Sequence, residues 1–221
     1  MKKSILIGFV AVAQFMSCSP DNTPSVSVIK PVPANPATTL PNENVSALFQ
    51  QFHGKYKVIS SVTSEPVDVD LNGISSVNLL QEMDELSLQG GTQYHTELKI
   101  YGPSPSSAKP SFTFIQWWPE QFIRTGVGKV WDGGELLSYN PDYVVKYNFQ
   151  SAYRSFSLSN DLRKITVNPD APNDAYRWVR PESVTVEANE RLRVTNKRRL
   201  YTRLGVKEVI ITTVYQRFTT S

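Results

Sequence analysis

Alternating apolar and polar residues run through most of the chain after residue 54, and this period of two predicts β-strands. Turn-forming residues separate the alternating segments at intervals of roughly 8–12 residues, which is typical of an all-β barrel or sandwich. We expect Pro119 to end the strand before it, because proline cannot donate to a strand ladder. The expected strands are residues 55–64, a hairpin over 84–101 that turns at 90–91, and then 111–118, 143–150, 162–167, 177–188, 191–196 and 206–218.

A helical period appears in only two places. Four apolar residues have the spacing of one helical face, namely Val45, Leu48, Phe49 and Phe52. They predict a helix over 45–53 that Asn44 caps and Gly54 ends. A second helical turn is expected at 77–82. Helix is otherwise scarce, so the sequence predicts an all-β domain that follows a short N-terminal helix.

The first 44 residues differ from the rest in composition. Residues 1–17 start with two lysines, continue with an apolar run of about a dozen residues and end in a small residue, which is the form of an export signal. The run is too short for a stable transmembrane helix. Residues 18–44 are rich in Pro, Ser, Thr and Asn without an apolar period, which predicts an extended tether. Residues 45–221 have the size of a single domain.

Cys18 is the only cysteine of the chain and therefore cannot form an internal disulfide. Its place directly after the export signal predicts a bacterial lipoprotein processing site, at which the thiol carries diacylglycerol and the new amino terminus carries a further acyl group such as palmitate. Such a set of acyl chains gives stable membrane attachment. Ser19, in place of an aspartate, favours the outer membrane of the cell envelope. The alternative is ordinary secretion with an unmodified thiol.

The charge of the chain argues against a nucleic-acid partner. The formal net charge is +3, and removal of residues 1–17 takes away two lysines and no acid, which leaves 21 basic against 20 acidic residues. The charge is unevenly distributed, since residues 65–97 hold seven acids and no Lys or Arg, whereas 191–217 hold eight bases and one acid. In a barrel the first and last strands pair and bring these stretches together, which favours a barrel. The alternative is two separate solvated faces.

The segment that begins with Gly54-Lys55-Tyr56 resembles the opening of lipocalin-like domains in lipoproteins of Gram-negative bacteria. Its features are the first long strand, an Asp-Leu-Asn-Gly turn at 70–73, and a short leucine-containing helix that ends near Glu82. The resemblance implies an antiparallel up-and-down β-barrel of the calycin type. It also implies that an arginine on a late strand packs over Tyr56 and closes the barrel near Gly54; Arg217 is the candidate, with Arg203 as its rival. The chain departs from the family in having Tyr at position 56, no disulfide and more than eight candidate strands.

Residues 68–73 read like the start of an EF-hand calcium loop. Asp68, Asp70 and Asn72 match its first three ligand positions and Gly73 its obligatory glycine. The position for the bidentate glutamate is occupied by Leu79, which has no side-chain oxygen. Turn chemistry explains the same residues without a metal, because Asp and Asn bond to their own backbone and Gly adopts positive φ. We therefore expect a turn and no cofactor, with a weak calcium site as the alternative.

No constellation of catalytic residues is recognisable, and we expect the protein not to be an enzyme. Aromatic residues crowd the middle of the domain. The alternating set within them predicts an interior lining for a small apolar or amphipathic ligand, although core packing explains the same residues. The alternative function is an outer-membrane interaction module that binds a glycan or a protein through exposed loops. The sequence leaves the oligomeric state open. The ligand-binding candidates are Phe112, Phe114, Trp117 and Tyr147.

Overall fold

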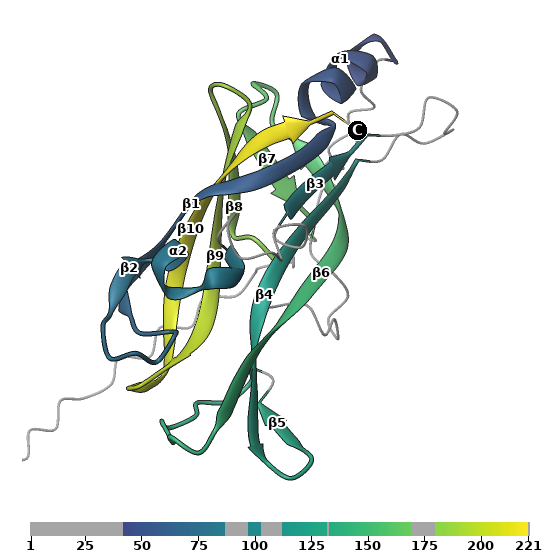
Figure 1. The fold of residues 1–221 in the computed structure, drawn as a ribbon. Coiled ribbons are helices and arrows are strands. Elements are labelled where there is room, and N and C mark those ends of the chain that lie inside the picture. The colour runs from purple at the N-terminus through teal and green to yellow at the C-terminus, as the bar shows by residue number, and fades with distance from the viewer. Residues whose placement is uncertain (1–41, 87–96, 103–111, 132, 169–179, 221) are drawn as a thin grey trace, which may run out of the picture. The chain divides into compact units, whose positions relative to one another are not determined.

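The computed structural model describes residues 42–86, 97–102, 112–131, 133–168 and 180–220, and its helices and strands lie in the compact unit Leu40–Ser221 (Figure 1). The predicted signal peptide, Cys18, most of the tether and the 90–91 turn lie outside the described residues. No helix within those ranges is long and apolar enough to cross a bilayer. The elements are α1 (Asn42–Phe52), β1 (Gly54–Val67), β2 (Ser76–Asn78), α2 (Leu79–Glu82), η1 (Asp84–Leu86), β3 (Glu97–Tyr101), β4 (Thr113–Gly126), β5 (Lys129–Trp131), β6 (Val144–Leu158), β7 (Lys164–Val167), β8 (Ser183–Glu187), β9 (Arg191–Thr202) and β10 (Gly205–Thr219).

Eight antiparallel strands close into a barrel. Each strand pairs with the next in the order β1, β3, β4, β6, β7, β8, β9 and β10, and β10 pairs back onto β1. The closing register runs from Lys55 opposite Thr219 to Thr63 opposite Ile211. The short strands β2 and β5, which the sequence did not predict, pair outside this ring. The predicted fold class, an all-β up-and-down barrel with a short N-terminal helix, is confirmed, and the sandwich is excluded.

Closure brings the acid-rich and base-rich stretches together, as the charge distribution predicts for a barrel. Lys207 Nζ lies 3.4 Å from a carboxylate oxygen of Glu65, and Arg203 Nε lies 3.6 Å from a carboxylate oxygen of Asp68. The Lys207–Glu65 pair joins β10 to β1, and the Arg203–Asp68 pair joins the turn before β10 to the loop that follows β1. Because Lys207, Glu65 and Arg203 keep 26–49% of their side-chain surface exposed, these pairs contribute only about 0–1 kcal/mol each, and both stretches also act as solvated faces.

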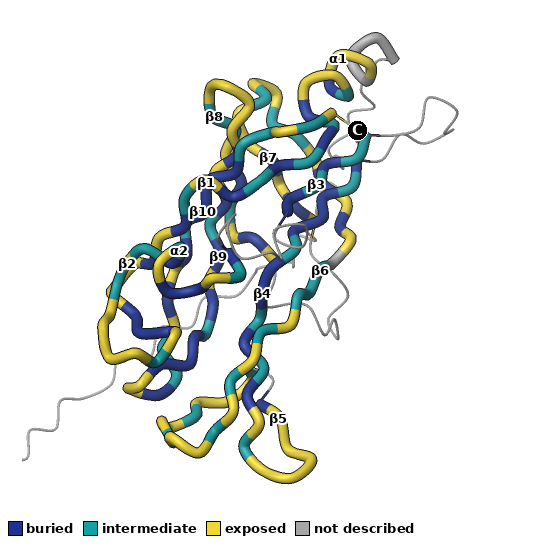
Figure 2. The backbone as a smooth tube through the Cα atoms, in the orientation of Figure 1, coloured by how far each residue is buried: buried dark blue, intermediate teal, exposed yellow. Residues whose placement is uncertain are grey.

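Alternation along β9 shows which of its side chains face the barrel interior. Leu192, Val194, Asn196, Arg198 and Leu200 are buried, while most of the residues between them are exposed or half-buried (Figure 2). One apolar core fills the end that α1 covers, and a second lies beneath α2. The largest fully buried side chains of the two are Trp118, Tyr56, Tyr215, Phe52, Phe114, Leu79 and Met83.

Two sequence-based expectations about strand ends are wrong. β4 continues through Pro119, which lies opposite Phe149 of β6. The other edge of β4 pairs with β3 only as far as Gln116 and with β5 only from Ile123 onward, so a residue without an N–H is accommodated there. Residues 84–86, expected as strand, form the 3-10 helix η1 instead. Local β propensity gives way here because Leu86 packs into the core beneath α2.

The two helices lie close to where the periodicity predicts them. α1 begins at Asn42 and not after the expected cap Asn44. Pro41 precedes it, and a proline is tolerated at a helix start because the first N–H groups have no helical partner. α2 occupies Leu79–Glu82 within the expected turn, and Asn78 caps it by accepting a hydrogen bond from the backbone N–H of Leu80.

Candidate functional site

Phe112 and Phe114, two of the expected ligand-binding residues, are buried in the apolar core near α1. The rings of Phe112 and Phe156 lie 5.3 Å apart in a tilted arrangement, which is favourable for aromatic pairs. Leu98, Ile100 and other members of the core surround them. The structure thus places both phenylalanines in the packing of the barrel.

The tandem tryptophans point to opposite faces of β4. Trp118 is fully buried inside the barrel, whereas Trp117 is half-buried on the outer face beneath the ammonium of Lys99, which lies 5.9 Å from its ring centre. Strand geometry predicts that only one of the two faces inward. Trp117 is therefore not an interior residue, and the expectation that it lines the interior is wrong.

Tyr147, the fourth expected ligand residue, is partly buried against the core beneath α2. Its hydroxyl donates a hydrogen bond to the carbonyl of Val69 at 3.3 Å. Burial is the main cause that raises the pKa of Tyr147, and the negative charge of Glu85 raises it further. The tyrosine thus ties β6 to the loop that follows β1.

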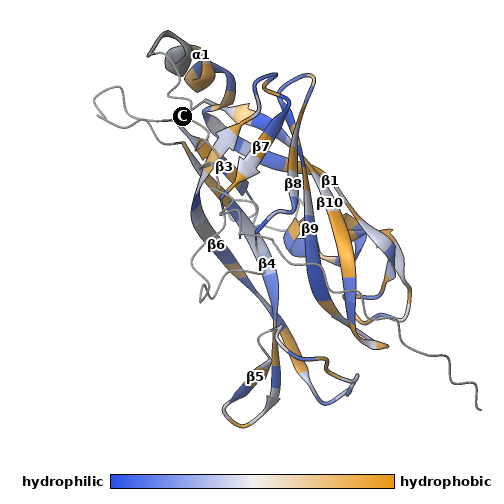
Figure 3. Ribbon diagram, turned by 180° about the vertical axis from the view of Figure 1, so that it is seen from behind, coloured by the Kyte–Doolittle hydropathy of each residue, from blue (hydrophilic) through white to orange (hydrophobic). Residues whose placement is uncertain are grey.

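A polar layer crosses the barrel between the two apolar cores. Gln116 on β4 donates to the hydroxyl of Tyr215 at 2.9 Å and to the Oδ1 of Asn196 at 3.2 Å. Ser61 and Thr213 form a further buried hydroxyl pair at 2.9 Å. Burial raises the pKa of Tyr215 to about 12, so its hydroxyl stays neutral. Figure 3 shows β9 as mostly hydrophilic and β10 as mostly hydrophobic, and exposed residues such as Arg193 and Lys197 contribute to the colour of β9.

Arg198 on β9 is a cation of this layer, and it is only 4% exposed. Its Nη1 donates to a carboxylate oxygen of Glu120, and its guanidinium carbon lies 4.4 Å from the ring centre of Trp118. Within the described part of the chain, its Nε and Nη2 and the indole Nε1 of Trp118 have no hydrogen-bond partner. Nε and Nη2 share the edge of a guanidinium that can bind a carboxylate through two parallel hydrogen bonds. Buried donors without acceptors are unfavourable, so an acceptor that reached these groups would stabilise them.

A separate hollow of about 320 Å³ lies at the α1 end of the barrel. Its charged residues already have partners: Arg217 pairs with Glu190, Arg191 donates to the side chain of Gln216, and Glu187 accepts from Arg193. Among the described residues of the hollow, only Nε of Arg217 is a buried polar atom without a hydrogen-bond partner, compared with three such atoms on Arg198 and Trp118. Its lining residues include Phe52, Tyr56, Val186, Leu192, Arg191 and Arg217.

Arg217 joins the last strand to the end of α1. It lies opposite Tyr56 in the closing register, and its Nη1 donates to the carbonyls of Gln50 and Gln51, both at 2.9 Å. Tyr56 donates to the carbonyl of Phe52 at 2.7 Å. Burial raises the pKa of Tyr56 to about 12, while the charge of Arg217 acts in the opposite direction. The rival Arg203 lies elsewhere, with its Nε donating to the carbonyl of Leu71.

His53 follows α1 directly and packs against its last turn. Its Nδ1 accepts the N–H of Gly102 at 3.3 Å, and its ring stacks on Phe49 with centroids 4.1 Å apart. Burial lowers the pKa of His53, and the positive charge of Arg217 lowers it further. The histidine is thus a packing residue at the helix end, while His95 lies outside the described residues.

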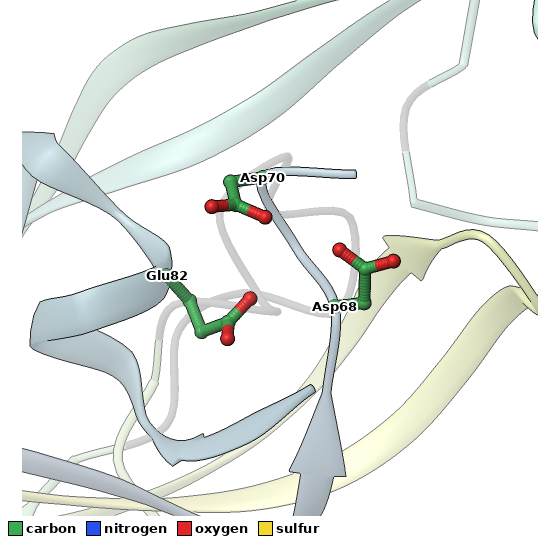
Figure 4. Close-up of side chains that lie close together, drawn as sticks. All are labelled: Asp68, Asp70 and Glu82. Atoms are coloured by element: carbon green, nitrogen blue, oxygen red, sulfur yellow. The ribbon is translucent and has the colours of Figure 1, made fainter. Parts of the chain in front are cut away.

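Three carboxylates converge where the loop after β1 meets α2 (Figure 4). Asp68, Asp70 and Glu82 each contribute an oxygen that lies within 4.8 Å of the other two. Two full negative charges at that separation repel by about 3 kcal/mol at an effective dielectric constant of 20. Burial raises the pKa of Glu82, and the charges of Asp70 and Asp68 raise it further.

Asn72, in contrast, serves the turn. Its Oδ1 accepts the N–H of Ile74 at 2.7 Å, and its Nδ2 donates to a carboxylate oxygen of Asp70 at 2.6 Å. Gly73 has φ of +93°, as the turn requires. The loop therefore contains the expected turn chemistry. The third carboxylate, Glu82, comes from α2 and lies later in the sequence than the last ligand position of an EF-hand loop.

Sequence reasoning missed Arg198, Trp118 and Glu82 as site residues. Alternation along 191–200 could have identified Arg198, because Arg198 is an even number of residues from Leu192 and Val194 and therefore faces the same side of the strand. Glu82 lies three residues beyond the bidentate position of an EF-hand loop, which is why its spacing argued against it as a ligand. No family model, curated protein or solved structure matches this chain, so these features rest on its own sequence and structure.

Proposed function

We propose that this chain is a membrane-anchored, non-enzymatic lipoprotein of the cell envelope whose lipocalin-like barrel binds a small amphipathic molecule with a carboxylate or similar acceptor group. Arg198 carries the proposal. Its unpartnered Nε and Nη2 lie between two apolar cores, so one end of a ligand would meet donors while the rest meets apolar walls. Glu120, the partner of its Nη1, is partly exposed and leaves that edge free.

Binding of a fluorescent long-chain carboxylate such as cis-parinaric acid tests this function. We expect the full chain, in detergent after removal of lipid, to bind the acid more tightly than its methyl ester. Arg198→Met should weaken binding of the acid by about 10- to 100-fold, because a hydrogen bond to a charged group is worth roughly 1.5–3 kcal/mol. The free energy of unfolding should change little, because methionine fills the place of a buried arginine and the remaining carboxylate, Glu120, is partly exposed to water.

Arg193→Met is the matched control for that experiment. Arg193 lies on the same strand, and 47% of its side chain is exposed, so its loss should leave binding unchanged. Equal affinities for acid and ester, or an Arg198→Met chain that binds the acid as the wild type does, would refute the carboxylate site.

The membrane anchor is supported by the sequence of residues 1–18. We expect the wild-type chain in the membrane fraction of a Gram-negative host, with a mass that includes diacylglycerol and a third acyl group on Cys18. Cys18→Ser should move the chain to the soluble fraction, because no acyl chain remains to hold it. Ser19→Ala, a change of the next residue, should leave it membrane-bound. A wild-type chain with a free thiol would contradict the anchor.

Exposed apolar side chains at loop tips favour an interaction module as the second function. Four of them belong to loops at the end of the barrel away from α1 (Figure 1), namely Ile74, Val127, Leu136 and Leu204. Scattered apolar residues are common on surfaces, but a group at one end is typical of contact with a partner. A chain that binds neither acid nor ester, and carries no small molecule in native mass spectrometry, would favour this function.

A further inference from the structure

We propose that Asp68, Asp70 and Glu82 form a binding site for a divalent cation, Ca²⁺ being the ion that their chemistry fits. This site is distinct from the Arg198 interior and would fix the loop that joins β1 to β2 against α2. Carboxylate oxygens are the ligands that Ca²⁺ prefers, and three carboxylates can supply up to about six oxygens, with water completing the sphere.

The geometry is suited to one ion. The three ligand oxygens lie within 4.8 Å of one another, and two oxygens on opposite sides of a Ca²⁺ ion are also about 4.8 Å apart at bond lengths near 2.4 Å. They come from two elements, the loop after β1 and the last residue of α2 (Figure 4). A single cation between them could contact all three after small rotations of these side chains.

Asp68 provides the second, independent observation. The residue is only 6% exposed, and its Oδ1 is buried without a hydrogen-bond partner in the described part of the chain. Oδ2 is already engaged, since it accepts the N–H of Gly73 at 3.1 Å and faces Arg203 Nε at 3.6 Å. Figure 4 shows the carboxylate of Asp68 with one oxygen turned toward the other two acids and one turned away. A buried carboxylate oxygen without a donor needs a cation or a proton.

The other oxygens of the cluster are partly satisfied, which argues for a moderate affinity. Oε2 of Glu82 accepts the N–H of Val69 at 2.9 Å, and both oxygens of Asp70 bond to Asn72. Arg203 is the only base that forms an ion pair with the cluster among the described residues, and it reaches Asp68 alone. We therefore expect a dissociation constant of about 0.1–1 mM, the range of extracellular calcium modules.

Calcium titration of the full chain in detergent tests the site. At 10 mM Ca²⁺, with NaCl matched for ionic strength in the reference, we expect the thermal midpoint to rise by about 5 °C. Tb³⁺ should give emission sensitised by Tyr147, whose hydroxyl bonds to the carbonyl of Val69 between the two aspartates, and Ca²⁺ should displace it.

Four variants decide the assignment. Asp68→Asn and Glu82→Gln should each lose the midpoint shift and the displaceable emission, whereas Asp142→Asn, an exposed loop aspartate outside the cluster, should keep both. If the two buried variants do not fold, Asp70→Asn replaces them, because Asp70 is exposed. A wild-type chain without shift or displaceable emission, or cluster variants that respond as the wild type does, would overturn the proposal.

Discussion

Gly54→Ala is expected to destabilise the barrel by about 4 kcal/mol. Gly54 has φ of +141°, a conformation that side-chain-bearing residues rarely adopt, and a Cβ there would lie 2.2 Å from the carbonyl oxygen of Thr219. Positive φ costs roughly 1–3 kcal/mol, and overpacking a filled site costs a similar amount. Gly54 begins β1, and Thr219 ends β10, so the clash should open the barrel between these two strands. Urea unfolding followed by tryptophan fluorescence measures the loss.

Two further glycines separate the causes. Gly128 has φ of +69° with nothing within 4 Å of a Cβ, so Gly128→Ala should cost only about 1 kcal/mol. Gly126 also has open space and no positive φ, and Gly126→Ala should change stability by about 0.5 kcal/mol or less. Equal losses for Gly54→Ala and Gly128→Ala would mean that the approach of Thr219 does not limit closure.

Arg217→Met should destabilise the domain by about 3 kcal/mol and release α1. The side chain is 9% exposed, and its Nη1 donates to the carbonyls of Gln50 and Gln51 at the helix end, where backbone acceptors lack helical partners. Loss of the charge also removes a favourable interaction with the helix dipole. Release should appear as faster proteolysis before Gly54 and as a rise in the pKa of His53, because the nearby positive charge is gone. Unfolding curves and histidine NMR titration measure both effects.

The controls for Arg217 use two other arginines. Arg191→Met removes an exposed arginine that bonds only to the side chain of Gln216 among the contacts described here, and it should cost less than about 1 kcal/mol. Arg203→Met tests the rival and should leave α1 and the pKa of His53 unchanged, because Arg203 bonds to Leu71. A helix that stays protected in Arg217→Met would show that core contacts alone hold it.

Much of the fold could be predicted because a period of two is a local property. Alternating residues predict strands at β1, β6, β9 and β10. The charge distribution favours a barrel over a sandwich, and the Lys207–Glu65 ion pair across the closing edge agrees with it. The continuation of β4 through Pro119 could not be predicted, because it depends on an unpaired strand edge. The 3-10 helix at 84–86 could not be predicted, because it depends on what packs beneath α2. Local propensity is blind to both.

The candidate sites show the same division. The tandem at 117–118 implied opposite faces, but only the register with β3 and β6 put Trp118 inside and Trp117 outside. Alternation along β9 places Arg198 with inward residues, but only the tertiary structure shows that Nε and Nη2 of Arg198 have no acceptor among the described residues.

The amino-acid sequence by itself determined the strands, the short N-terminal helix, the turn residues after β1 and the lone cysteine after an apolar leader. Each depends on side chains close together in the chain. Barrel closure, the inward direction of Arg198 and the approach of Glu82 to Asp68 were decided only by tertiary structure. These contacts join residues far apart in sequence, and their positions follow from the register of long-range backbone hydrogen bonds, which no local pattern specifies.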